Sequence, residues 1–237
     1  MLRSRSLLVL SLARAASVHV RAASFLPPLP ELGHKEELMA SHGFSSAANW
    51  LVPGHVLLGA NPTKGRGACM TRMRPIRCDA LCDCFVSLQA EVPPMDSPLP
   101  FPESYAADAR EAKPEPAPAF ITFPIDDLQP ASSLQYLATI VEELATRVRN
   151  REVLYIHCFA GRGRTGLVAA CLLGELYEGV TADEALERVA AYYRLRAGFG
   201  VAASRAADGM SPETEAQRQQ VRDFFAARAT WMQECSS

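Results

Sequence analysis

A run of ten residues, 157–166, constrains what this chain can fold into more than any other stretch, and its sequence is HCFAGRGRTG. A mainly apolar run (152–156) precedes this decapeptide, and an apolar helical pattern (167–176) follows it. The context predicts a buried strand, a tight loop and the N-terminus of a helix. Unpaired backbone N–H groups and the positive end of the helix dipole make such a junction an anion site.

Two side chains give this anion site chemical reactivity. Cys158 lies where the local field favours a negative charge, so we expect a thiolate at neutral pH. Arg164 offers a planar guanidinium whose paired N–H donors match two phosphate oxygens. We expect Thr165 to donate a hydroxyl hydrogen bond to the sulfur, and the ring of His157 to hold the loop through hydrogen bonds to the backbone.

The decapeptide resembles the His-Cys-(any five)-Arg-Ser/Thr signature of the cysteine-dependent protein tyrosine phosphatase superfamily, in particular its atypical dual-specificity branch. The alternative, a buried cysteine before an ordinary glycine-rich turn, leaves the coincidence of cysteine, arginine and glycines unexplained. The resemblance implies a metal-independent phosphatase without a cofactor, which acts through a cysteinyl-phosphate intermediate. The residues implied to bind the phosphate are Phe159, Ala160, Gly161, Arg162, Gly163 and Arg164.

A phosphatase of this kind needs a carboxylic acid that protonates the leaving oxygen and later activates water. A strand predicted over 120–125 ends in two adjacent carboxylates directly before a helical pattern. The resemblance assigns the acid to Asp127, with Asp126 as the near alternative. A pair of solvated carboxylates that cap the helix is the other interpretation.

The resemblance also implies a supporting role near the start of the last predicted helix. Gln217 matches a glutamine that positions the water for the second step in some branches of the family. A glutamine on the helix surface is an equally good interpretation of so short a motif.

The resemblance covers residues 49–229 and implies an α/β fold, a short, mostly parallel central sheet flanked by helices. Our own pattern analysis agrees, with strands expected near residues 56, 85, 120 and 153. Residues 91–119 interrupt this domain and hold eight of the seventeen prolines. This composition predicts a surface insertion that builds no core; disorder is the favoured interpretation, and a flap over the active-site mouth is the alternative.

The composition excludes few partners. A formal net charge of -2 gives no reason to expect nucleic acid. No apolar run approaches the roughly 20 residues of a transmembrane helix. We expect a monomer whose partner is a phosphorylated protein substrate.

Two other functions fit the same residues. One is a phospho-binding protein without useful catalysis, and the other is a phosphoinositide or other non-protein phosphatase. The phosphoinositide branch has two basic positions in the loop, of which Arg162 matches one and Phe159 does not match the other.

Seven cysteines, an odd number that includes the proposed nucleophile, favour a reducing compartment. A group of four lacks the paired short spacings of zinc sites, so no metal is predicted. Three of these cysteines remain candidates for a protective disulfide with Cys158. The group consists of Cys69 and the three disulfide candidates, Cys78, Cys82 and Cys84.

Both ends of the chain carry basic segments. Residues 1–30 are rich in Arg, Ser, Ala and Leu and contain no acidic residue, which is typical of a transit peptide and predicts a mitochondrion or plastid. A secretory signal over 7–13 and a disordered cytoplasmic tail are the alternatives. In the basic stretch 194–209, Arg194, Arg196 and Arg205 are candidates for contacts with an anionic substrate, but solvated loop charges are the favoured interpretation.

Overall fold

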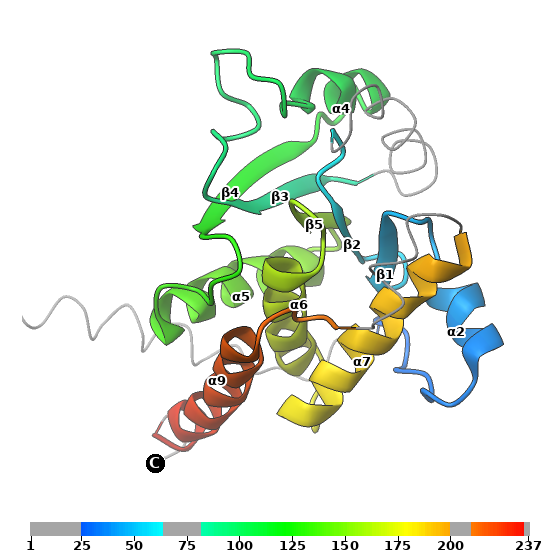
Figure 1. The fold of residues 1–237 in the computed structure, drawn as a ribbon, viewed down its shortest axis with the longest axis vertical. Helices are drawn as coiled ribbons and strands as arrows, with labels where there is room; N and C mark the ends of the chain where they lie inside the picture. The colour runs from blue at the N-terminus through cyan, green and yellow to red at the C-terminus, as the bar shows by residue number, and fades with distance from the viewer. Residues whose placement is uncertain (1–24, 64–81, 200–209, 235–237) are drawn as a thin grey trace, which may run out of the picture.

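The computed structural model describes residues 25–63, 82–199 and 210–234, and its centre is a five-stranded sheet in the order β1-β2-β5-β3-β4 (Figure 1). β1 is antiparallel to β2, and all other neighbouring strands are parallel. The predicted α/β class with a short, mostly parallel sheet is confirmed. The strands are β1 (Ala48–Val52), β2 (Val56–Ala60), β3 (Cys84–Gln89), β4 (Ala119–Ile125) and β5 (Leu154–Cys158).

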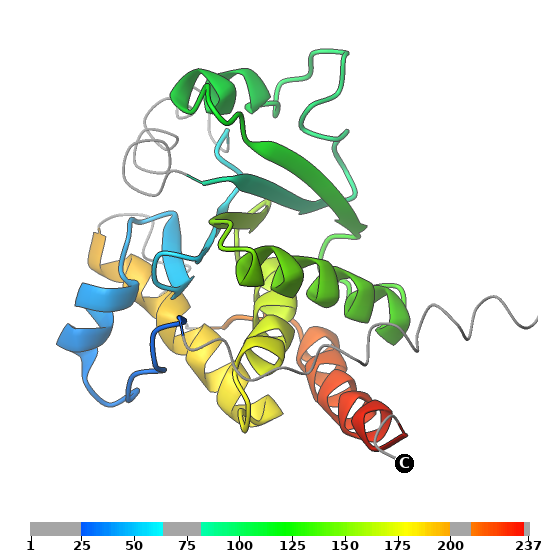
Figure 2. The ribbon, with the colours of Figure 1, turned by 180° about the vertical axis from the view of Figure 1, so that it is seen from behind.

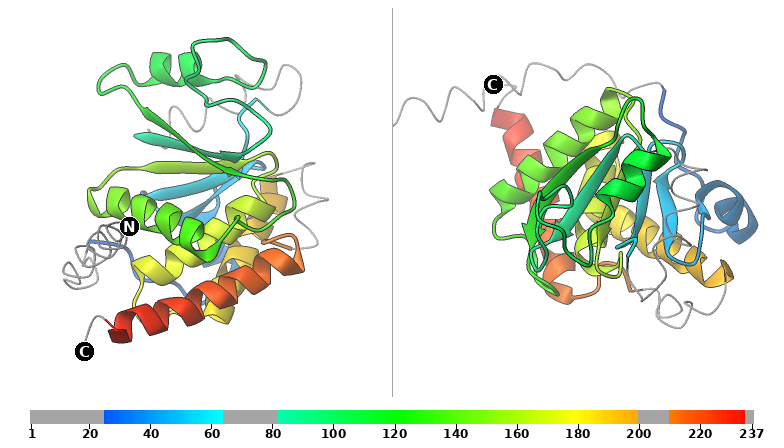
Figure 3. Two further views of the ribbon diagram at one scale, coloured as in Figure 1. Left: turned by 90° about the vertical axis from the view of Figure 1, so that its left-hand side faces the viewer. Right: turned by 90° about the horizontal axis from the view of Figure 1, so that it is seen from above.

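Helices cover both faces of the sheet (Figure 2, Figure 3). Four of them, α5, α6, α7 and α9, pack on one face, whereas α4 packs on the other. The inner strands are therefore buried on both faces, which explains their nearly continuous apolar sequences. The helices are α2 (Lys35–His42), α4 (Ala106–Ala112), α5 (Leu134–Arg149), α6 (Gly163–Leu176), α7 (Ala182–Arg194), the 3-10 helix η3 (Leu195–Phe199) and α9 (Glu215–Glu234).

The decapeptide occupies the junction between β5 and α6, as the sequence predicts. Successive side chains of β5 point to opposite faces, so Ile156 and Cys158 belong to the core beneath α5 and α6. Tyr155 and His157 face the α4 side instead, where their rings stack. The loop after Cys158 consequently emerges at the carboxyl edge of the parallel strands, the edge at which open α/β sheets bind ligands.

The prediction that residues 91–119 build no core is wrong. Met95 and Tyr105 are 1% exposed, and they pack with Phe85 and Tyr155 in a second apolar cluster on the α4 face. The segment therefore closes that face of the sheet. Its prolines and turns separate single large apolar side chains, and such isolated positions leave no periodic pattern in a sequence.

The folded unit begins upstream of residue 49, where the sequence places its start. Segment 25–34 lies against the helices: the Tyr177 hydroxyl donates to the Pro27 carbonyl at 2.9 Å, and Arg188 donates to the Pro30 carbonyl at 2.7 Å. The predicted transit peptide falls mainly on residues 1–24, outside the described residues. Within the described ranges, no helix combines the length and apolar character needed to cross a membrane.

Candidate active site

The loop of the decapeptide closes tightly against β2. Gly161 has φ 66°, and a Cβ at this position would lie 2.2 Å from the carbonyl carbon of Gly59. Only glycine fits this left-handed, close-packed position without displacing the strand. On the other side, the backbone N–H of Asn61 donates to the Phe159 carbonyl at 3.2 Å. The loop is therefore held in one conformation by the strand beneath it.

A buried arginine fixes the loop from below. Arg196, in η3, donates to the Gly161 carbonyl at 3.1 Å, to the Leu58 carbonyl at 3.1 Å and to Asn49 at 2.7 Å. Both interpretations of Arg196 are wrong: its side chain is 3% exposed, so it is not a solvated loop charge, and its guanidinium binds these protein groups and not a substrate. Arg194 is exposed, and Arg205 lies outside the described residues.

Arg164 is the best-connected side chain of the site. Its guanidinium, 1% exposed, donates to the Ile125 carbonyl at 3.0 Å and forms an ion pair with Asp127 at 2.9 Å. Two further N–H groups bind both oxygens of Glu91, at 2.6 and 2.9 Å. The structure thus brings together Arg164 and the predicted acid Asp127, and adds a second carboxylate that the sequence analysis did not name.

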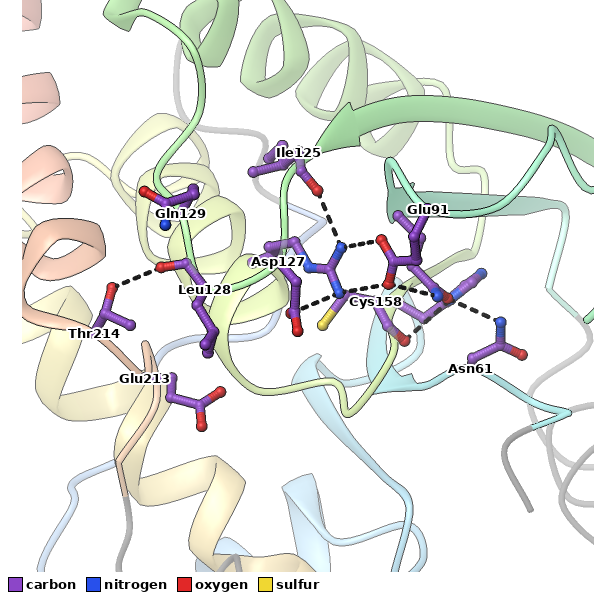
Figure 4. A network of polar contacts seen from close by, with 12 residues as sticks. Asn61, Glu91, Ile125, Asp127, Leu128, Gln129, Cys158, Glu213 and Thr214 are labelled. Atoms are coloured by element: carbon purple, nitrogen blue, oxygen red, sulfur yellow. Dashed lines mark hydrogen bonds and ion pairs between the residues drawn. The ribbon is translucent and has the colours of Figure 1, made fainter.

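Glu91 is held by a chain of polar contacts (Figure 4). Gln89 donates to the Glu91 carboxylate at 3.0 Å, and Asn61 donates to Gln89 at 2.8 Å. Burial opposes ionisation of Glu91, but hydrogen bonds from Arg164, the backbone and Gln89 outweigh it and lower its pKa. Glu91 lies two residues beyond the end of β3, at the same sheet edge as the loop. This position could have indicated Glu91 as a site residue from the sequence, because the carboxyl ends of parallel strands meet at one edge of a sheet.

The two candidate acids differ in orientation. Asp127 points its carboxylate toward the guanidinium of Arg164 (Figure 4). Asp126 is exposed, and its carbonyl accepts a hydrogen bond from the Gln129 N–H at 3.1 Å, which closes the turn. Both carboxylates are exposed, and Asp127 is the one that contacts Arg164.

Gln217 is buried, so the interpretation as a surface glutamine is wrong. Its side-chain oxygen accepts from the backbone N–H groups of Glu213 and Thr214, both at 3.1 Å, and its amide donates to the Gln129 carbonyl at 3.0 Å. Thr214 also donates its hydroxyl to the Leu128 carbonyl at 3.3 Å. The start of α9 therefore fixes the loop that carries Asp127.

His157 has an unforeseen partner from the proline-rich segment. The Tyr105 hydroxyl lies 2.5 Å from Nε2 of His157, and Nδ1 of the same ring lies 3.4 Å from the Cys158 carbonyl. Burial lowers the pKa of His157 to about 3, so the ring is neutral. The predicted backbone contact of His157 is present, although a distance of 3.4 Å makes it weak.

Three other expectations can be compared with the described residues. The Thr165 hydroxyl is buried and has no hydrogen-bond partner among them, so the expected bond to sulfur is not formed. Arg162 donates to the Met210 carbonyl at 2.7 Å and pairs with Glu213 at 3.5 Å. Cys84 lies opposite Leu154, at the far end of β5 from Cys158, which rules out a disulfide between Cys84 and Cys158. Cys78 falls outside the described ranges.

A cysteine that ends a parallel strand and a buried arginine in the first turn of the next helix, joined by a tight backbone loop, define the class of cysteine-dependent protein tyrosine phosphatases. The comparison with protein families agrees. A family model described as "Swiss Army Knife protein, DSP-PTPase phosphatase domain" (PTP-SAK) matches residues 45–221, and the chain belongs to this family.

The individual relatives either match a short part of the chain or share a low sequence identity with it. Cyclin-dependent kinase inhibitor 3 of Rattus norvegicus is 46% identical over 48 residues, which are 20% of this chain and 23% of that protein. Tk-PTP in its active form aligns with a TM-score of 0.50 and 21% identity over 76% of this chain and 97% of its own. Kinase associated phosphatase aligns with a TM-score of 0.50 and 18% identity, over 73% and 87%. At 21% and 18% identity, these two structural alignments show a shared fold.

Proposed function

We propose that this protein hydrolyses phosphomonoesters on phosphorylated proteins, on tyrosine, serine or threonine, through a cysteinyl-phosphate intermediate. One observation carries the proposal: the carboxylate of Asp127 lies 2.9 Å from the guanidinium of Arg164, in the first turn of the helix that the loop after Cys158 enters. An acid and a phosphate-binding cation are therefore in contact beside the loop that follows the nucleophile.

The reaction follows from this placement. The Cys158 sulfur attacks phosphorus, and a sulfur–phosphorus bond forms as the bond to the leaving oxygen breaks. Arg164 and the loop N–H groups stabilise the equatorial oxygens. Asp127 gives its proton to the leaving oxygen, then accepts a proton from the water that attacks the phosphocysteine. Inorganic phosphate leaves, and the thiolate is restored.

The test compares steady-state hydrolysis of an aryl phosphate by the wild type and by three variants. Cys158→Ser abolishes turnover, and Asp127→Asn lowers kcat by about 100-fold, a typical contribution of acid catalysis. Asp126→Asn is the matched control, because it removes the same charge one residue away from the Arg164 contact, and it leaves kcat nearly unchanged. Equal rates for the wild type and Cys158→Ser would remove the enzyme assignment.

A further inference from the structure

Two buried primary amides lie at the ends of neighbouring elements beside the proposed phosphate site. Asn61 directly follows β2 and Gln89 ends β3, and each residue is 1% exposed. A buried amide is costly unless its polar atoms are hydrogen-bonded. The partners of these two amides therefore show what the amides hold in place.

The amides form a hydrogen-bond chain that runs in one direction. The Thr63 backbone N–H donates to Oδ1 of Asn61 at 2.9 Å, which leaves the Asn61 NH₂ group to face Gln89. Asn61 donates to Oε1 of Gln89 at 2.8 Å, and Gln89 donates to Oε1 of Glu91 at 3.0 Å (Figure 4). Because a backbone N–H can only donate, it sets the orientation of both amides.

The chain ends on a carboxylate that also binds the buried cation of the site. Arg164 donates from Nη1 and Nη2 to the two oxygens of Glu91, at 2.6 and 2.9 Å, and from Nη1 to the Ile125 carbonyl at 3.0 Å. Within the described ranges, no protein group accepts the Nε–H of Arg164. Glu91 therefore occupies one end of the guanidinium. The edge between Nε and Nη2 is left for a phosphate, with Asp127 beside it at 2.9 Å.

Glu91 needs support because it is the exposed member of this pair. Its side chain is 42% exposed, against 1% for Arg164. An exposed carboxylate can rotate into water, and the guanidinium would then lose the two bonds that set its plane. Gln89 has no such freedom, because it is buried in a strand and bonded at both ends of its amide. Gln89 therefore ties an exposed carboxylate to a rigid strand.

We propose that Gln89 and Asn61 are positioning residues, which hold Glu91 and through it turn the Nε–Nη2 edge of Arg164 toward the phosphate. This inference rests on the proposed function in taking Arg164 as the phosphate-binding cation. Hydrogen bonds aligned head to tail in a buried chain strengthen one another, so both amides contribute to the hold on Glu91. A guanidinium fixed in this way binds two phosphate oxygens without further ordering.

Gln89→Glu tests the chain, because a carboxyl group has the shape of the amide but can replace its donor only while protonated. At low pH the new carboxyl group donates its proton to Glu91. As the pH rises this proton is lost, and two carboxylates then face each other. Glu91 is the titratable group that contacts position 89, with Arg164 and Asp127 beyond it. The readout is kcat/KM for an aryl phosphate, divided by the wild-type value at the same pH.

We expect this ratio to be close to the wild-type level at pH 5 and about tenfold lower at pH 7.5. Recovery at pH 5 also shows that the variant is folded. Asn61→Asp repeats the test one link further away, with an expected fall of about threefold, and decides the matter if Gln89→Glu does not fold. Gln220→Glu is the matched control, because its amide binds only the backbone of Ala131, and its ratio stays constant.

The Glu91→Gln background shows whether Gln89 acts through Glu91. In that background the substituted amide can donate to the new carboxylate, so Gln89→Glu loses its pH dependence relative to Glu91→Gln alone. An undiminished pH dependence there would mean that the new charge acts through space. That result, or a constant ratio in both Gln89→Glu and Asn61→Asp, would overturn the positioning role.

Binding of inorganic phosphate in the Cys158→Ser background separates this inference from the proposed function. Isothermal titration calorimetry gives the Kd, and we expect Gln89→Glu to raise it at pH 7.5 but not at pH 5. Such a change without turnover by the protein with intact Cys158 supports the positioning role and removes the enzymatic activity. Turnover by the wild type, with pH-independent ratios in both variants, does the reverse.

Discussion

Tyr105→Phe tests whether the proline-rich segment organises the nucleophile. The substitution removes one oxygen from a residue that is 1% exposed, so it leaves almost no cavity. It deletes the 2.5 Å bond to Nε2 of His157, a ring that is itself fully buried. An unsatisfied buried group costs about 1–3 kcal/mol. For a domain of this size, about 2 kcal/mol lowers Tm by about 4–8 °C.

The effect on chemistry follows from the tautomer of His157. Burial lowers the pKa of His157 to about 3 and raises the pKa of Tyr105 well above its usual value, so a phenol donates to a neutral ring. Nε2 accepts, and the proton lies on Nδ1, 3.4 Å from the Cys158 carbonyl. Without Tyr105 this preference is lost, and we expect kcat to fall by about tenfold, or about 1.4 kcal/mol.

Tyr155→Phe is the matched control. Tyr155 is equally buried and its hydroxyl donates to the Ala60 carbonyl at 2.6 Å, so its loss lowers Tm similarly without touching the His157 nitrogen atoms. The assays are thermal unfolding, kcat on an aryl phosphate and ¹⁵N chemical shifts of the His157 ring. If the two variants show the same kcat and the same ring shifts, Tyr105 is merely structural and the reasoning is refuted.

Three further predictions concern the surroundings of the loop. Glu91→Gln removes the negative charge that faces Arg164, so we expect the Ki of inorganic phosphate to fall by about threefold. We also expect kcat to decrease, because the bidentate pair that orients Arg164 is lost. Unchanged values of both Ki and kcat would contradict this. Gln217→Ala removes the hydrogen bond to the Gln129 carbonyl, and we expect it to lower kcat. The control Gln220→Ala removes only the hydrogen bonds to Ala131 and leaves kcat unchanged. A pre-steady-state burst in Gln217→Ala would instead assign Gln217 to the positioning of the hydrolytic water. Burial, reinforced by Arg188, lowers the pKa of His42 to about 4, so the unfolded chain takes up the proton first and stability falls as pH drops below 6.5. At pH 5 this costs about 2 kcal/mol, from about 1.5 pH units at 1.36 kcal/mol each; His42→Phe removes it in denaturant titrations at pH 7 and 5, and an unaltered pH dependence would contradict the assignment.

The anion site itself was predictable because its parts are neighbours in the chain. Strand, loop and helix follow one another within 152–176, and local hydrophobic patterns predict each of them. The family resemblance pointed to Asp127, which lies two residues beyond the end of β4 and contacts Arg164 at the same edge of the sheet. The proline-rich segment was misjudged because its buried residues, such as Met95 and Tyr105, have no periodic spacing.

The sequence by itself determined the groups from which the proposed chemistry is built: the cysteine, the arginine, the glycine loop and a carboxylate just beyond β4. Tertiary structure alone decided which distant side chains hold that chemistry in place. Glu91 reaches Arg164 across 73 residues of chain, Tyr105 reaches His157 across 52, and Arg196 reaches Gly161 across 35. The physical reason is that such contacts depend on strand order, register and side-chain direction, which no local pattern of residues specifies.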